Sequence, residues 1–263
     1  MDLGLAGKGA FVAGADGGIG SAVCRAFVRE GVERLTLSVM KRSDGDQIFE
    51  ELGQNKDLSL QVVECNLEDP TAPERAVAEG EAHGPIDIVA MCAGAFPMGG
   101  LWDVDEDGWA LGLNTKLLGS ARLIRAAVPA MAERGWGRVV IIAGLRGRLP
   151  SNAAVLGGVI NVGIANLVSA VAKEVGSNGV TVNSIDPAHV RTPRWDTRIA
   201  AMCDSEGISD QEAVDRIRKS AAVKRMTAPD EVADLIAFLA SERAGMITGS
   251  SIVIDGGSYP GLY

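Results

Sequence analysis

Short apolar runs alternate with longer segments of helical period along most of the chain. Each run is apolar at nearly every position, which is typical of parallel strands covered by helices on both faces. The pattern therefore predicts an α/β fold with a doubly wound, seven-stranded parallel sheet, formed by residues 1–263 as a single domain. The runs expected to form strands are Gly9–Ala13, Leu35–Val39, Leu58–Val63, Ile86–Met91, Arg138–Ala143, Val180–Ile185 and Ser251–Ile254.

Two segments between the strands stand out. The polar insert Trp195–Ser220 precedes a helix predicted at Pro229–Ser241, and we expect it to form a helical flap over a pocket. The segment Ala153–Val175 has a helical period but is apolar or small on nearly all sides. We expect it to pack on the sheet and on another subunit; a helix fully buried within one chain is the alternative.

Charge and composition limit the kinds of partner. The chain has 263 residues and a net charge of −9, so no basic face can be assembled for nucleic acid or an anionic membrane. A small-molecule partner is favoured instead. We expect no membrane-spanning segment and a cytoplasmic location. The four cysteines lie far apart without a CxxC pair, which favours reduced thiols and no metal site.

A glycine-rich segment, Gly14-Ala15-Asp16-Gly17-Gly18-Ile19-Gly20, follows the first predicted strand and opens a helix. Glycine at position 14 permits a tight turn, while Gly18 and Gly20 let backbone amides approach a pyrophosphate at the positive end of the helix. A dinucleotide site is the functional interpretation. A tight strand-to-helix turn that binds nothing is the alternative.

Several motifs in order make the whole chain resemble the short-chain dehydrogenase/reductase family, whose fold is Rossmann-like and whose members use NAD or NADP. The glycine segment resembles the family's TGxxxGxG loop, and Asn114 matches its helical asparagine. The remaining matches are Met91–Gly94 at the family's NNAG, Gly137–Ile142 at the strand before its serine, Val182–Pro187 at its VNxxxPG, and Ile254–Gly257 at its VDGG.

The chain departs from this family at the catalytic residues. The serine, tyrosine and lysine positions are occupied by Gly144, Gly157 and Asn161, and no tyrosine precedes Tyr259. In the family, tyrosine supplies the proton, lysine lowers the tyrosine pKa, and serine holds the carbonyl oxygen. Glycine has no proton to give, and we expect the two glycines to leave space, which suits either a bulkier substrate or no substrate at all.

A replacement acid or base must come from the loops that follow the strand ends. The candidates are His189, Asp186, and a water held by Asn114 and Asn161. A histidine without chemistry in a loop is the alternative interpretation of His189. The residues expected on the substrate side are Gly144, Arg146, Arg148, Gly157 and Trp195. The two arginines could bind a carboxylate or phosphate of the substrate; the alternative is that they are ordinary surface residues.

The cofactor preference between NAD and NADP stays open. Asp16 would repel a 2′-phosphate, whereas Lys41 and Arg42 would attract one. No aspartate ends the second strand, and Asn66 stands at the family's adenine-binding aspartate, so we expect a formed but weakened cleft. The expected cofactor-binding residues are Gly14, Asp16, Gly17, Gly18, Ile19, Gly20, Lys41, Arg42, Asn66, Ala93, Gly94, Pro187 and Thr192.

Three functions are compatible with the sequence. The favoured one is an NAD(P)-binding enzyme of the oxidoreductase family that works without the tyrosine, or that has become a lyase or isomerase. The second is a silent subunit paired with an active family member through Ala153–Val175, and the third is a ligand sensor. Because that helix builds the family's dimer interface, the resemblance implies a homodimer, homotetramer or hetero-oligomer.

Overall fold

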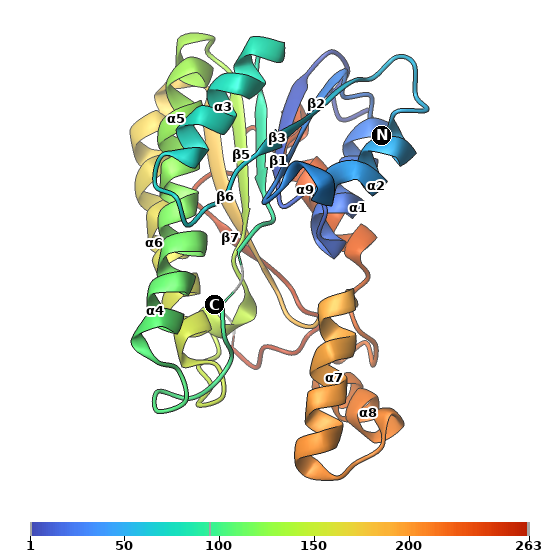
Figure 1. Cartoon of the computed structure of the whole chain (residues 1–263). Coiled ribbons are helices and arrows are strands. Elements are labelled where there is room, and N and C mark those ends of the chain that lie inside the picture. Colours follow the sequence, from blue (N-terminus) through green and yellow to red (C-terminus); the bar gives the residue numbers. More distant parts are fainter. Residues whose placement is uncertain (1, 95, 262–263) are drawn as a thin grey trace.

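The computed structural model describes residues 2–94 and 96–261. Its seven strands form one parallel sheet in the order β3-β2-β1-β4-β5-β6-β7 (Figure 1). The predicted single-domain, Rossmann-like α/β fold is therefore confirmed. The strands are β1 (Gly9–Ala13), β2 (Arg34–Val39), β3 (Ser59–Glu64), β4 (Ile88–Met91), β5 (Gly137–Ile142), β6 (Val180–Pro187) and β7 (Ser251–Ile254).

Helices cover both faces of this sheet. In Figure 1, α1, α2 and α9 lie on one side and α3, α5 and α6 on the other. Two short turns matter for the site: the π-helical turn η2 (Leu113–Leu118) and the 3₁₀ turn η3 (Leu145–Gly147). The helices are α1 (Gly18–Arg29), α2 (Asp46–Leu52), α3 (Ala72–His83), α4 (Glu106–Gly112), α5 (Gly119–Glu133), α6 (Val155–Val175), α7 (Pro193–Glu206), α8 (Asp210–Ser220) and α9 (Pro229–Leu239).

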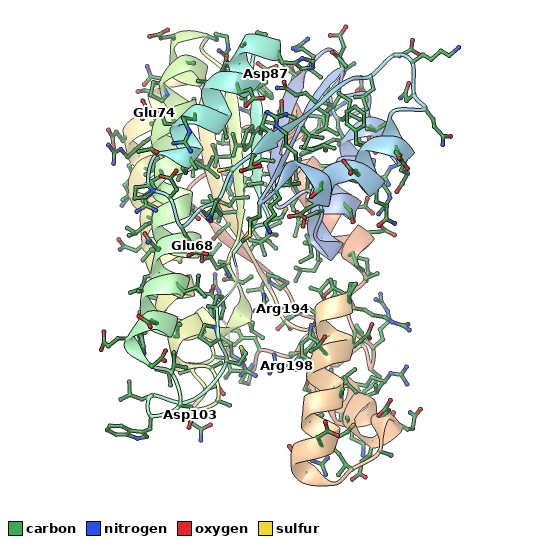
Figure 2. The ribbon with its side chains drawn as sticks, viewed as in Figure 1. Glu68, Glu74, Asp87, Asp103, Arg194 and Arg198 are labelled. Carbon is green, nitrogen blue, oxygen red and sulfur yellow. The ribbon has the colours of Figure 1, made fainter. Side chains whose placement is uncertain are left out.

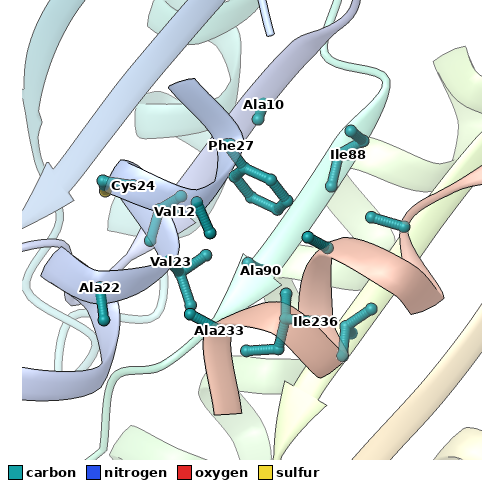
Figure 3. Packing of buried hydrophobic residues seen from close by; sticks show 14 of the residues in the cluster. Ala10, Val12, Ala22, Val23, Cys24, Phe27, Ile88, Ala90, Ala233 and Ile236 are labelled. Atoms are coloured by element: carbon teal, nitrogen blue, oxygen red, sulfur yellow. The ribbon is translucent and has the colours of Figure 1, made fainter. Parts of the chain in front are cut away.

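The continuous apolar strands serve two cores. Along β1, Ala10 and Val12 face α1 and α9, while Phe11 faces the opposite core, because successive strand residues point to opposite faces. Figure 3 shows Phe27 of α1 and Ile236 of α9 in one cluster of buried side chains over the strands. A fully buried side chain of this size contributes about 1.5–3 kcal/mol, so the sheet is a rigid platform for the residues at its edge.

The strand order reverses between β1 and β4. Loops that follow these two strands therefore diverge and leave a crevice at the carboxyl edge of the sheet, where ligands bind in folds of this type. The glycine segment follows β1 and residues 92–94 follow β4. The fold thus brings two of the sequence motifs to one place.

The polar insert forms α7 and α8, two helices joined by a short turn. Both extend beyond the carboxyl ends of the strands (Figure 1). The turn uses Gly207 in the left-handed region, with φ of 65°, which lets the chain reverse between the helices.

One helix has the length and composition of a membrane span, which the sequence pattern did not lead us to expect. Among the described residues, 155–178 alone is long and apolar enough. Within the domain, however, Leu156, Ile160, Ile164 and Val168 of this segment are buried in the core. These buried positions are apolar because α6 packs on the sheet along that side. Val159 and Val162, on the other side of the helix, are exposed.

Candidate active site

The glycine segment forms a cradle that side chains would fill. Gly14 has φ of 75°, and a Cβ there would lie 2.9 Å from the Ala93 backbone. A Cβ on Gly20 would lie 1.9 Å from the Gly14 carbonyl oxygen. Gly17 caps α1 without a side-chain hydrogen bond, so the first amides of the helix remain donors for an anion. These features fit the pyrophosphate of a dinucleotide.

A cavity of about 730 Å³ adjoins this cradle. It is bounded by the segments that follow β4, β5 and β6 and by the first turns of α7. Ile19 and Thr192 connect it to the glycine segment, since a Cβ on Gly18 would lie 2.8 Å from the Thr192 side chain. Of the expected cofactor residues, Ile19, Ala93, Gly94, Pro187 and Thr192 line this one cavity.

Lys116 reaches the cavity from η2 and is 7% exposed. Its Nζ donates to the carbonyl oxygen of Ala143 at 2.7 Å and to Oδ1 of Asn161 at 3.0 Å. Burial, reinforced by the positive charge of Arg194, lowers the Lys116 pKa to about 7. The site therefore holds an amine that changes charge near neutral pH.

Gly144 and Gly157, which we predicted at the family's serine and tyrosine positions, do not have open space where a side chain would begin. A Cβ on Gly144 would lie 2.8 Å from the Asn161 side-chain nitrogen, and Gly144 has φ of 152°. A Cβ on Gly157 would lie 2.8 Å from the Phe96 ring. The Asn161 amide and the Phe96 ring occupy these directions, so the expectation of added room is wrong.

Two of the catalytic candidates are held by other partners. Oδ1 of Asn114 accepts from Arg122 at 2.8 Å, and the Asn114 side chain does not line the cavity. Asp186 is 3% exposed and accepts from Arg148 at 2.9 Å and from the backbone amide of Gly144 at 3.3 Å. Asp186 and Arg148 therefore form an ion pair next to Gly144, in which the carboxylate is buried and the guanidinium is half-buried.

Asn161 and His189 do line the cavity. The ring of His189 packs edge-on against Trp195, with 4.9 Å between ring centroids. Burial, followed by the charges of Arg198 and Arg146, lowers the His189 pKa to about 4. Its imidazole is therefore neutral at pH 7, where it has no proton to give as a strong acid.

Arginines give this cavity a positive lining. Arg146, Arg194 and Arg198 all border it, and Figure 2 shows Arg194 and Arg198 on the side of α7 that faces the rest of the domain. None of the three forms an ion pair within the described part of the chain, whereas ten other arginines do. In a protein of net charge −9, this concentration of unpaired cations favours an anionic ligand.

The polar residues expected to bind the adenosine part of the cofactor differ in whether other side chains or backbone groups already hold them. Arg42 donates to the Val62 carbonyl oxygen at 2.6 Å and pairs with Glu79 at 2.5 Å, so it is held away from the crevice. Lys41 is exposed and has no ion pair among the described residues. Oδ1 of Asn66 accepts from the Glu68 amide at 3.0 Å. Asp16 lies on the glycine segment, where partial shielding of its carboxyl group from water, with Asp44 nearby, raises its pKa.

Sequence reasoning missed Lys116, Phe96, Arg194 and Arg198. A signal for Lys116 was present: it is the one charged residue in the otherwise apolar or neutral run Leu113–Leu118, two positions after the motif asparagine. The wider turn of a π-helix, a feature often found at functional sites, sets which of these side chains faces inward. That geometry is not readable from a 3.6-residue period.

The fold and the crevice define the class, a nucleotide-binding α/β enzyme domain. Residues 13–259 match the family described as enoyl-(acyl carrier protein) reductase. The oxidoreductase UcpA of Escherichia coli (strain K12) is 31% identical, with 97% of this chain and 95% of that protein aligned. Human dehydrogenase/reductase SDR family member 4 is 30% identical, covering 97% and 88% of the two chains. The chain belongs to the short-chain dehydrogenase/reductase family of oxidoreductases.

Solved structures agree with this membership. L-sorbose reductase from Gluconobacter frateurii, complexed with NADPH and L-sorbose, superposes with a TM-score of 0.93 at 26% identity over 100% of both chains. A 3-oxoacyl (acyl-carrier-protein) reductase from Agrobacterium tumefaciens C58 with NADP bound gives a TM-score of 0.89 at 26% identity, covering 97% of this chain and 96% of that chain.

Proposed function

We propose that this protein is an NADP(H)-dependent oxidoreductase that acts on the carbonyl or hydroxyl group of a small anionic molecule. The observation that carries the proposal is the continuity between the glycine cradle and the cavity: Ile19 and Thr192 belong to both. A dinucleotide held by the cradle would supply or take up a hydride at the cavity. The arginines that line the cavity would bind the anionic part of the substrate.

The cofactor choice is supported by the end of β2. Val39 and Met40 stand where an acidic ribose ligand would favour NAD, and the exposed Lys41 follows them. Two similar structures carry NADPH or NADP. Asp16 and Asp44 act in the opposite direction, so we expect a moderate preference rather than an absolute one.

The amine in the cavity supports an active enzyme over a silent subunit or a sensor, neither of which needs a titrating group there. We further propose a cytoplasmic location, in keeping with four free cysteines. Self-association through the exposed side of α6, where Val159 and Val162 lie, completes the proposal. Another copy of this chain is the proposed partner.

The first experiment is calorimetric titration of the protein with NADPH, NADH, NADP+ and NAD+. We expect micromolar binding of NADPH, about tenfold tighter than NADH. Lys41→Glu should abolish this preference, because it replaces the cation next to the 2′-phosphate by an anion. Lys56→Glu, at an exposed turn outside the crevice, is the matched control. Absence of binding at millimolar dinucleotide would refute the proposed function.

The substrate class is tested by a screen for NADPH oxidation with oxo-carboxylates, each paired with its uncharged amide. The unpaired arginines predict turnover of the carboxylate and at least a tenfold lower kcat/KM for the amide. Equal rates for both members of every pair would show that the arginines do not bind the substrate anion.

A further inference from the structure

Lys116 stands between the positions of two missing catalytic residues. Its hydrogen-bond partners are the carbonyl oxygen of Ala143, next to the serine position at 144, and the side chain of Asn161 at the lysine position. The amine comes from η2, a different element from the one that carries the family's tyrosine and lysine. An ionisable group has therefore entered the same part of the cavity by another route.

The two partners direct the chemistry of the amine. An ammonium group has three N–H donors and a neutral amine has two donors and a lone pair. Ala143 and Asn161 accept two hydrogens at fixed places. The third donor of the ammonium, or the lone pair of the amine, has no hydrogen-bond partner among the described residues and is left for the cavity that Lys116 lines. Proton exchange at this nitrogen is thus aimed at a bound ligand.

The surroundings keep both protonation states accessible. Lys116 is 7% exposed, its side chain packs against Gly94, and its Nζ lies 5.3 Å from the Phe96 ring centroid. A general acid–base group works best with a pKa near the working pH, and burial brings the Lys116 pKa to about 7. His189, the other titratable candidate on the cavity, is neutral at that pH.

We propose that Lys116 is the catalytic acid and base of this site, giving a proton to the substrate oxygen in reduction and taking it back in oxidation. The inference rests on the proposed function. In reduction the carbonyl carbon gains a hydride from the reduced dinucleotide, which is oxidised, and the carbonyl oxygen gains a proton. The N–H bond of the Lys116 ammonium breaks as the O–H bond forms. Water then reprotonates the neutral amine.

The first test needs no cofactor. In protein labelled with ¹³C-lysine, the Cε resonance of Lys116 is assigned by its loss in Lys116→Met and followed against pH. We expect a midpoint near 7, well below the ordinary lysine value of about 10.4. A Lys116 midpoint above 10 would overturn the proposal whether or not a dinucleotide binds.

The second test measures reduction of an active oxo-carboxylate from the screen. Lys116→Met and Lys116→Arg should both lower kcat by about 10²–10⁴-fold, because arginine retains positive charge but does not release a proton. The dinucleotide Kd should change by no more than a few-fold. The exposed Lys173→Met is the control and should keep the parent rate.

Chemical rescue separates proton transfer from a structural role. Lys116→Ala leaves a cavity that small primary amines can enter, so ethylamine should restore part of the lost kcat in proportion to the concentration of its protonated form. A kcat within a few-fold of the parent in Lys116→Met would overturn the inference while leaving the proposed function intact. Failure of dinucleotide binding would overturn the proposed function and leave the amine titration as a separate result.

Discussion

Lys116→Met should change how the stability of the folded protein depends on pH. An unfolded lysine titrates near pH 10.4, whereas in the fold burial lowers the Lys116 pKa to about 7. Between these values the unfolded chain binds one more proton than the folded chain. The free energy of unfolding therefore rises with pH across this window, by about 1.4 kcal/mol per pH unit. Below pH 7 the penalty of a buried charge is present in full.

Buried thiols act in the opposite direction at higher pH. Burial raises the pKa of Cys65 to about 11 and that of Cys92 to about 12, and it also raises that of Cys24. An unfolded thiol loses its proton near pH 8.5, so each of these cysteines reduces stability as pH rises beyond that value. The contribution of Lys116 is therefore measured as a difference between parent and variant, in which the cysteines cancel.

The assay is urea unfolding of the parent and Lys116→Met at pH values from 6.5 to 9. Methionine does not titrate, so the free energy of unfolding of Lys116→Met, relative to that of the parent, should fall by about 2 kcal/mol between pH 7 and pH 8.5. Within this range, the variant should be most stable relative to the parent at pH 6.5, because the substitution removes a buried cation. A difference that stays constant over this range would refute the reasoning, because Lys116 would then titrate alike in both states.

Two further predictions concern the Arg148–Asp186 ion pair and the exposed side of α6. Arg148→Met leaves the Asp186 carboxylate buried without its cation and should lower the free energy of unfolding by about 3 kcal/mol. Arg216→Met, which breaks only exposed ion pairs, should lower the free energy of unfolding much less, because water and salt screen such pairs. Equal losses in urea unfolding would show that the Asp186 pair contributes no more than an exposed one. Replacing Val159 and Val162 together by Asp should dissociate the proposed oligomer in sedimentation velocity, and an unchanged sedimentation coefficient would place the contact elsewhere.

Much of the scaffold could be predicted from the sequence because the information is local. Continuous apolar runs form parallel strands, and a glycine segment between a strand and a helix has few alternative conformations. The predicted bounds of β2 and β3 differ from those in the structure by one residue. The assignment of Gly144, Gly157 and Asn161 to the family's serine, tyrosine and lysine positions also comes from the sequence, and it stays a prediction.

The chemistry at the pocket depended on distances that no local pattern contains. Asp186 and Arg148 are 38 positions apart in sequence, and only the fold makes them an ion pair that removes both from the pocket. Arg122 likewise takes Asn114 away from its expected role. Only the structure shows that the space next to Gly144 is occupied by Asn161 and the space next to Gly157 by Phe96.

The sequence by itself determined the parallel sheet and the glycine cradle, because periodicity and glycine placement act within a few residues of the chain. The tertiary structure decided which charged groups meet in the cavity. The π-helical turn of η2 brings Lys116 to Asn161, and α7 brings Arg194 and Arg198 to the same cavity. Burial and neighbouring charges set the Lys116 pKa, and both are properties of the assembled fold.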